Sequence, residues 1–132
     1  MSQHKKDIEG LEDIKILVDN FYYSIQRDNL LGPIFHAVIK DNWTPHLEKM
    51  YSFWNTILFD VHSYSGRPFP PHADLPIQEE HFNRWLSLFE NTVDQNFEGS
   101  IAENAKFRAN KMAELFQIKL NNIRKDPFKP LV

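Results

Sequence analysis

The feature that most constrains the fold is a helical hydrophobic period that recurs along most of the chain. Apolar residues return every three or four positions in four long segments. We expect helices from about Asp13 to Arg27, from Asp41 or Thr44 to Phe59, between Pro76 and Asn96, and from Ile101 to Arg124. No segment alternates with the two-residue period of a strand, and no Asn-Gly or Asp-Gly hairpin signal occurs. The sequence therefore predicts an all-α protein built from four main helices.

Glycines and prolines mark the breaks between these helices. Leu31-Gly32-Pro33 is expected to end the first helix, with Gly32 as a left-handed cap, and residues 34–39 to form an apolar corner and a short turn. Between the second and third helices, three of the eight residues of Phe69–Pro76 are prolines, so this stretch cannot be regular helix or strand. Such a rigid loop is suited to hold the His72 side chain in one fixed direction.

Length and composition narrow the class of protein. A chain of 132 residues fits one domain over 1–132, with flexible ends at 1–12 and 125–132. The net charge of −3 gives no reason to expect nucleic acid or a membrane surface as a partner. The chain has no cysteine, which excludes disulfides, zinc–thiolate sites, iron–sulfur clusters and cysteine catalysis. Without a signal core or a transmembrane run, we expect a cytoplasmic protein.

The aromatic content is high, with 11 Phe, 4 Tyr and 3 Trp. So many rings could form a rigid core or could line a slot for a flat ligand. Four side chains with polar tips accompany them, namely Tyr22, His46, His72 and Trp85. Taken singly, each is most simply an ordinary core or loop residue. An imidazole held like that of His72 is also what an axial metal or haem ligand requires.

Other chemistry finds little support. The chain has no glycine-rich phosphate loop, no Gly-x-Ser-x-Gly elbow and no His-Glu-x-x-His zinc helix. His72 and Asp74 could supply two ligands to a non-haem metal, but no third ligand is evident nearby. The acidic pair Glu90 and Asp94 is expected to lie on a solvated face.

Several short motifs follow one another in a fixed order. They are Phe21-Tyr22, Leu31-Gly32-Pro33-Ile34-Phe35, Trp43-x-x-His46, Phe53-Trp54, His72-x-Asp74-Leu75-Pro76 and Phe82-x-x-Trp85-Leu86-x-Leu88-Phe89. No single motif is specific, but the ordered set resembles the truncated haemoglobins, and within them the third group. The two-glycine motifs of the other groups are absent, as the low count of 4 Gly reflects.

The resemblance implies a short globin fold whose helices sandwich haem b (iron protoporphyrin IX). It implies His72 as the proximal iron ligand, Tyr22 and Trp85 at the distal ligand-binding positions, and His46 at the distal-histidine position. The remaining haem contacts that it implies are Phe35 at the globin corner, Lys49 toward a propionate, and Met50, Phe53 and Ile57 along the cavity. Pro45 departs from the pattern, because it could alter where the distal helix starts.

The implied role is binding of dioxygen and other diatomic gases, as in oxygen transport, by a monomer that could work with a reductase. Two alternatives remain open. One is a haem enzyme that oxidises nitric oxide or uses peroxide. The other is a helical interaction module without haem.

Overall fold

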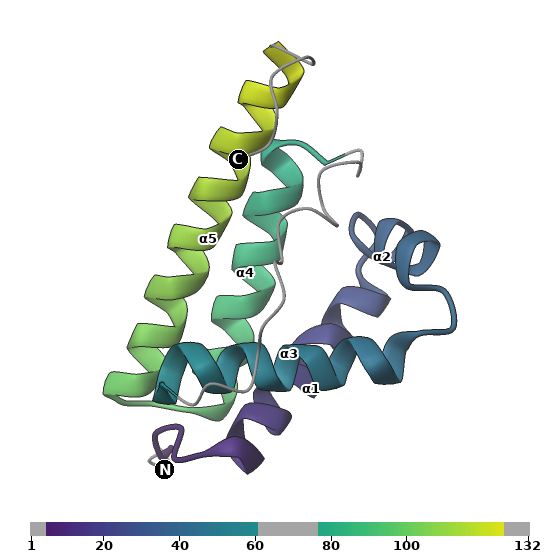
Figure 1. Cartoon of the computed structure of the whole chain (residues 1–132). Coiled ribbons are helices and arrows are strands. Elements are labelled where there is room, and N and C mark those ends of the chain that lie inside the picture. Colours follow the sequence, from purple (N-terminus) through teal and green to yellow (C-terminus); the bar gives the residue numbers. More distant parts are fainter. Residues whose placement is uncertain (1–4, 61–76, 126–132) are drawn as a thin grey trace.

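The computed structural model describes residues 5–60 and 77–125, which form five helices. These are α1 (Leu11–Arg27), α2 (Gly32–Ile39), α3 (Trp43–Phe59), α4 (Glu79–Asn96) and α5 (Ser100–Lys125) (Figure 1). No strand occurs within the two described ranges, so the predicted all-α class is confirmed. In the same part of the chain, no helix is long and apolar enough to cross a membrane.

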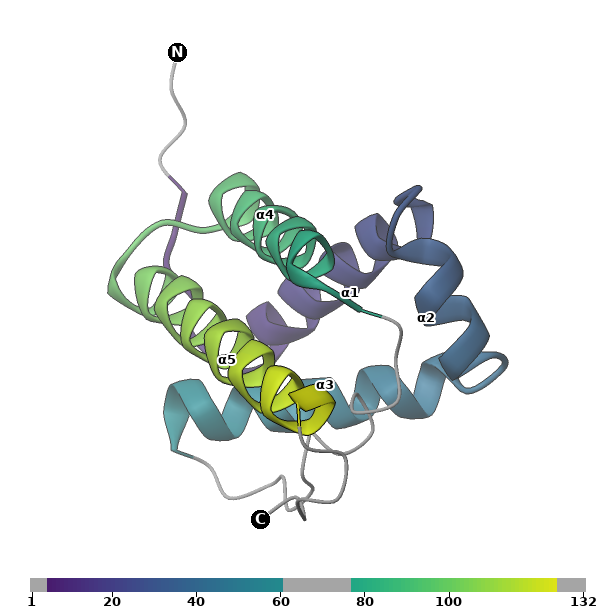
Figure 2. The same ribbon diagram turned by 90° about the horizontal axis from the view of Figure 1, so that it is seen from above.

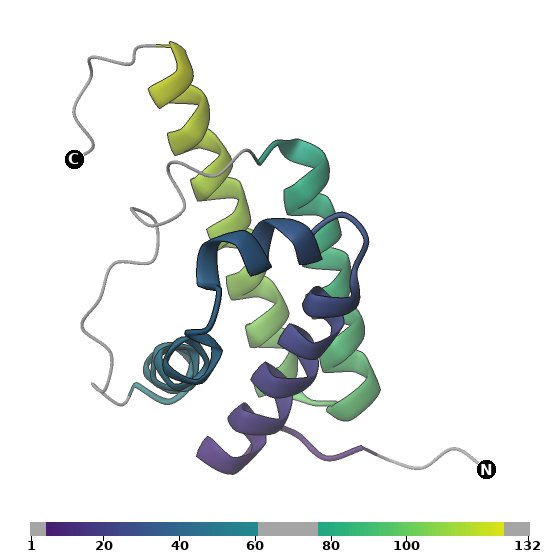
Figure 3. The ribbon, with the colours of Figure 1, turned by 90° about the vertical axis from the view of Figure 1, so that its right-hand side faces the viewer.

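The helices cross rather than form a parallel bundle. α4 and α5 run side by side in opposite directions, and α1 packs against α2, α3 and α4 (Figures 1 and 2). α3 runs across this group, and Figure 3 shows it nearly end-on. α1 is therefore the central helix, and one side of it carries fully buried residues along its length: Ile14, Leu17, Val18, Phe21 and Ile25.

A set of stacked aromatic rings joins three of the helices at the centre of the core. The ring of Phe89 on α4 stacks on Trp54 of α3, with centroids 4.9 Å apart and an interplanar angle of 18°. The ring of Phe21 on α1 meets Phe89 edge-on at 5.1 Å. Offset stacks and edge contacts are the favoured geometries for aromatic pairs, so these rings fix how the three helices cross.

The corner between the first two helices differs from the sequence prediction. α1 ends at Arg27, well before Gly32, and its cap Asp28 is extended. Gly32 opens a further helix, α2, in which Pro33 occupies the first turn, where proline is favoured. A Cβ atom on Gly32 would lie 2.9 Å from the carbonyl oxygen of Gln26. Gly32 is thus needed for close approach of α2 to the end of α1, and the prediction of a left-handed cap and four helices was wrong at this point.

The chain before α1 packs against the turn between α4 and α5. Ile8 is buried, although residues 1–12 were expected to form a flexible extension. The carboxylate of Asp7 accepts hydrogen bonds from the backbone N–H groups of Ile101 and Ala102, at 2.9 and 2.8 Å. Asp7 therefore caps the start of α5 from a distant part of the sequence. Gly99, with φ of 143°, leaves room for this carboxylate, because a Cβ there would lie 2.5 Å from Asp7 Cγ.

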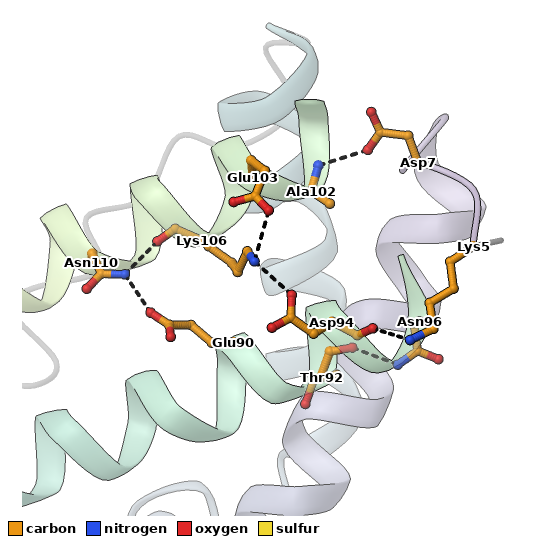
Figure 4. A network of polar contacts seen from close by, with 10 residues as sticks. All are labelled: Lys5, Asp7, Glu90, Thr92, Asp94, Asn96, Ala102, Glu103, Lys106 and Asn110. Carbon is orange, nitrogen blue, oxygen red and sulfur yellow. Dashed lines mark hydrogen bonds and ion pairs between the residues drawn. The ribbon is translucent and has the colours of Figure 1, made fainter. Parts of the chain in front are cut away.

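A polar network joins α4 to α5 beside this cap (Figure 4). The Lys106 ammonium pairs with the carboxylates of Asp94 at 2.7 Å and Glu103 at 3.1 Å. The Asn110 side chain donates to the Glu90 carboxylate at 2.8 Å. The acidic pair lies at the surface, as expected, with Asp94 exposed, and its two carboxylates also link α4 to α5.

Replacing Asp7 by alanine tests the remote cap. We expect Asp7→Ala to lower the free energy of unfolding by about 1–2 kcal/mol, because the first turn of α5 loses its acceptor. Burial disfavours the charged carboxylate, but its hydrogen bonds from Ile101 and Ala102 prevail and hold the pKa of Asp7 below the ordinary 3.8. The stabilisation is therefore present above that pH and lost as the pH falls through the lowered pKa. Urea unfolding at several pH values measures both effects.

Asp94→Ala is the matched control, since it removes an aspartate from an exposed ion pair with Lys106. We expect it to cost about 0.5 kcal/mol or less. Equal losses in the two variants would contradict the capping role of Asp7.

Candidate functional site

A cluster of aromatic rings surrounds Tyr22 near the end of α1. Tyr22 is only 6% exposed. Its ring lies 4.9 Å from that of His46 and 6.2 Å from that of Trp43, both on α3, and 6.3 Å from that of Phe35 on α2. Each contact is edge-on. Three helices thus bring together Tyr22, His46 and Phe35, all of them site residues predicted from the sequence.

Burial widens the pH range over which Tyr22 stays neutral. The loss of solvent around the phenol raises its pKa above the ordinary 10.0. The side chain therefore remains a neutral O–H group at physiological pH and can donate a hydrogen bond.

His46 faces inward from the first turns of α3. Its Nε2 atom is buried, and its ring meets the rings of Tyr22 and Trp43 at right angles. The backbone N–H of His46 donates to the Asn42 carbonyl at 3.1 Å, so the helix is already formed at this position. Pro45 therefore lies within the first turn, as expected for a proline, and does not prevent His46 from facing Tyr22.

Trp85 on α4 extends the ring system in another direction. Its ring stacks on Phe89 at 5.6 Å with an angle of 7°, and it meets Phe21 edge-on at 5.3 Å. Phe21 also contacts Tyr22, with centroids 5.0 Å apart. Tyr22 and Trp85 therefore share Phe21 as a neighbour, and both side chains are held by rigid aromatic packing.

The C-terminal part of α3 supplies an apolar wall. Phe53 is buried, while Met50 and Ile57 are half-buried and pack against the core. They continue along the helix from His46 at helical spacing. Lys49 is exposed, so its ammonium group can reach outward from the same stretch.

His72 and Asp74 lie outside the described residues, so their placement relative to the ring cluster stays a prediction. The same holds for the rest of residues 61–76 and for the tail after Lys125. Within the described part of the chain, no group of three or more histidine, cysteine, aspartate or glutamate residues could hold a metal ion.

Sequence reasoning gave no role to Trp43, which contacts three other rings. Its ring lies against Tyr22 and His46 and also 5.5 Å from the ring of His36. The sequence did contain a signal for this position. Trp43 lies three residues before His46 and four before Leu47, which is the spacing of neighbours on one side of a helix. Trp43 closes the outer end of the ring cluster.

Beside Tyr22, a surface pocket of about 340 Å³ lies between α1 and α3. Its lining residues are Asp19, Tyr22, Tyr23, Gln26, Thr44, Leu47, Glu48 and Tyr51. The Tyr51 hydroxyl donates to the Asp19 carboxylate. Burial together with this carboxylate raises the pKa of Tyr51 to about 12.

Comparison with known proteins identifies the class to which this fold and ring cluster belong. The family model described as bacterial-like globin matches residues 6–120, so the chain belongs to this family. Over 110 residues it is 34% identical to a Group 3 truncated hemoglobin of Campylobacter jejuni, covering 80% of this chain and 87% of the relative.

A crystal structure of group III truncated hemoglobin from Campylobacter jejuni is also similar, with a TM-score of 0.81 and 32% identity. The match covers 88% of this chain and 94% of that one. The resemblance to the third group of truncated haemoglobins, and the truncated globin fold, are thereby confirmed.

Truncating Trp43 tests whether it holds the ring cluster together. We expect Trp43→Ala to lower the free energy of unfolding by about 2 kcal/mol, because a half-buried ring and its edge contacts with Tyr22 and His46 are lost. Urea unfolding measures the loss. Trp43→Phe should retain most of the unfolding free energy, and equal losses in the two variants would contradict the role of the ring.

Proposed function

We propose that this protein binds haem b and takes dioxygen and other diatomic ligands at the haem iron. Membership of the globin family supports haem binding and diatomic ligands in general. The observation that carries the more specific proposal is the buried phenol of Tyr22, enclosed by His46, Trp43 and Phe35. Burying a hydrogen-bond donor costs free energy unless an acceptor binds to it. A polar diatomic ligand could be such an acceptor.

The described residues fit a flat aromatic cofactor. Met50, Phe53 and Ile57 offer an apolar wall on α3, and Phe35 adds a half-buried ring on α2. Sites for such groups are mostly apolar with a few placed polar groups. We assign the exposed Lys49 to a haem propionate, because a cation at the edge of the slot would pair with that carboxylate.

We assign His72 as the protein ligand to the iron. When bound, haem would supply an iron atom that an imidazole nitrogen of His72 could hold and that could take a small diatomic ligand. The prolines Pro71 and Pro76 restrict the backbone around His72, which favours a fixed direction for its ring. The second ring N–H requires an acceptor that sets the orientation of the imidazole.

We assign Tyr22 and Trp85 as the donors that retain the ligand, with His46 as their neighbour. The phenol O–H and the indole N–H would stabilise negative charge on the outer atom of dioxygen, whereas carbon monoxide would gain less. Hydrogen bonds to charged groups contribute about 1.5–3 kcal/mol each. Two such bonds would slow ligand release by about a hundredfold or more.

The visible absorption spectrum of the haem-loaded protein tests the assignment of His72. We expect a sharp Soret band that shifts when the reduced protein meets carbon monoxide, and that is lost or strongly changed in His72→Ala. His81→Ala is the control, because His81 lies at the start of α4, where its Nδ1 accepts from the Gln78 backbone N–H at 2.9 Å. A His72→Ala protein that is helical and has an unchanged spectrum would refute the assignment.

Ligand dissociation rates test the two donors. We expect Tyr22→Phe and Trp85→Phe each to raise the dioxygen dissociation rate by about tenfold, measured by stopped-flow displacement, with a smaller change for carbon monoxide. Tyr23→Phe is the matched control, since Tyr23 is the next residue on α1 and its hydroxyl pairs with Arg27 on the surface. Unchanged rates in both variants would remove Tyr22 and Trp85 from the proposed role.

A further inference from the structure

The outer side of α5 carries large apolar residues that face solvent. Phe107, Leu115 and Ile118 are 56%, 47% and 51% exposed. Together with Lys111 and Glu114 they recur at intervals of three and four residues and so lie on one side of the helix. We call these five residues the α5 stripe.

The stripe lies opposite the side of α5 that builds the core. The inward positions are occupied by Ala105, Ala109, Ala113 and Leu120, all of them buried. α5 stands beside α4 at the edge of the molecule (Figure 1). A solvent-facing side of a surface helix normally carries polar residues, and a row of exposed apolar side chains marks an interaction surface.

Four of the five residues in the stripe are placed symmetrically, in a way that fits a second copy of the same chain, and the mirror position of Leu115 is Asn110. Phe107 and Ile118 are equally far from the point between Met112 and Ala113, and so are Lys111 and Glu114. A two-fold axis through this point would lay two α5 helices antiparallel. Phe107 would then face Ile118 of the second copy, and Lys111 would face Glu114 of the second copy.

We propose that the protein forms an antiparallel homodimer through the α5 stripe. A two-fold interface presents the same surface twice, so each apolar and each charged contact occurs in duplicate. Lys111 and Glu114 pair within one chain at 3.8 Å on the surface, and both stay exposed enough to be shared with a partner. The charges are complementary across the axis and oppose a parallel arrangement, in which like charges would meet.

The size of the stripe sets the strength of association. From Phe107 to Ile118 the helix rises about 16 Å, so the contact is smaller than a standard interface of about 1,600 Å². The dimer is therefore weak and concentration-dependent, which departs from the monomer expected from the sequence.

Sedimentation equilibrium of the haem-loaded protein, from micromolar to near-millimolar concentration, tests the proposal. The mean mass should rise from the 15.7 kDa of one chain toward twice that value. Ile118→Lys should remove the rise. Ile16→Lys is the matched control, because Ile16 on α1 is similarly exposed at 45% and should leave association unchanged.

Charge reversal tests the antiparallel register itself. Lys111→Glu alone and Glu114→Lys alone each place like charges across the axis, and we expect self-association about tenfold weaker in each case. An equimolar mixture of these two variants restores both cross-pairs, so it should associate like the unchanged protein. Loss of the pairing within one chain cannot produce this rescue, because both chains of the mixture lack it.

A protein that sediments as a monomer at every concentration would overturn the proposal. So would association that survives Ile118→Lys, or a mixture of the two charge variants that associates no better than either variant alone.

Discussion

The fold depends on one stack of aromatic rings, in which Phe89 of α4 lies between Trp54 of α3 and Trp85 of its own helix. Phe21 of the central helix closes the stack edge-on. Flat rings in such contact tolerate little sliding, because interiors are packed as densely as organic crystals. The ring stack therefore transmits the position of α4 to α1, and Tyr22, next to Phe21 in sequence, takes its place from the same packing that stabilises the core.

Polar contacts stabilise the region where α4 ends and α5 begins. Apolar packing alone would leave the backbone N–H groups at the start of α5 without acceptors. Asp7 satisfies the first turn of α5, and Lys106 bridges α4 to α5 through Asp94. These contacts join the chain before α1 to its last helix. The carboxylate at the cap accepts hydrogen bonds from N–H groups in the first turn of α5, which have no partner within the helix.

The sequence predicted those features that depend on hydrophobic period. The helices from Trp43 to Phe59 and from Glu79 to Asn96, and the position of Tyr22 beside the apolar side of α1, followed from apolar spacing. The direction of the His46 ring did not follow from the sequence, because it depends on contacts with α1. The prediction failed at α2, where a glycine–proline pair reads equally as a helix end or a helix start, and only the close approach of Gly32 to Gln26 decides between them. The cap by Asp7 and the ring contacts of Trp43 depend on contacts between segments, which local patterns do not encode.

The burial of Tyr22 has a consequence for how ligand binding would respond to acidity. Because burial raises the pKa of the phenol, its hydroxyl keeps its proton at any pH that a cell reaches. A ligand retained by this hydroxyl would leave without proton uptake or release at that group. Any dependence of ligand retention on pH in this protein would then come from titratable groups other than Tyr22.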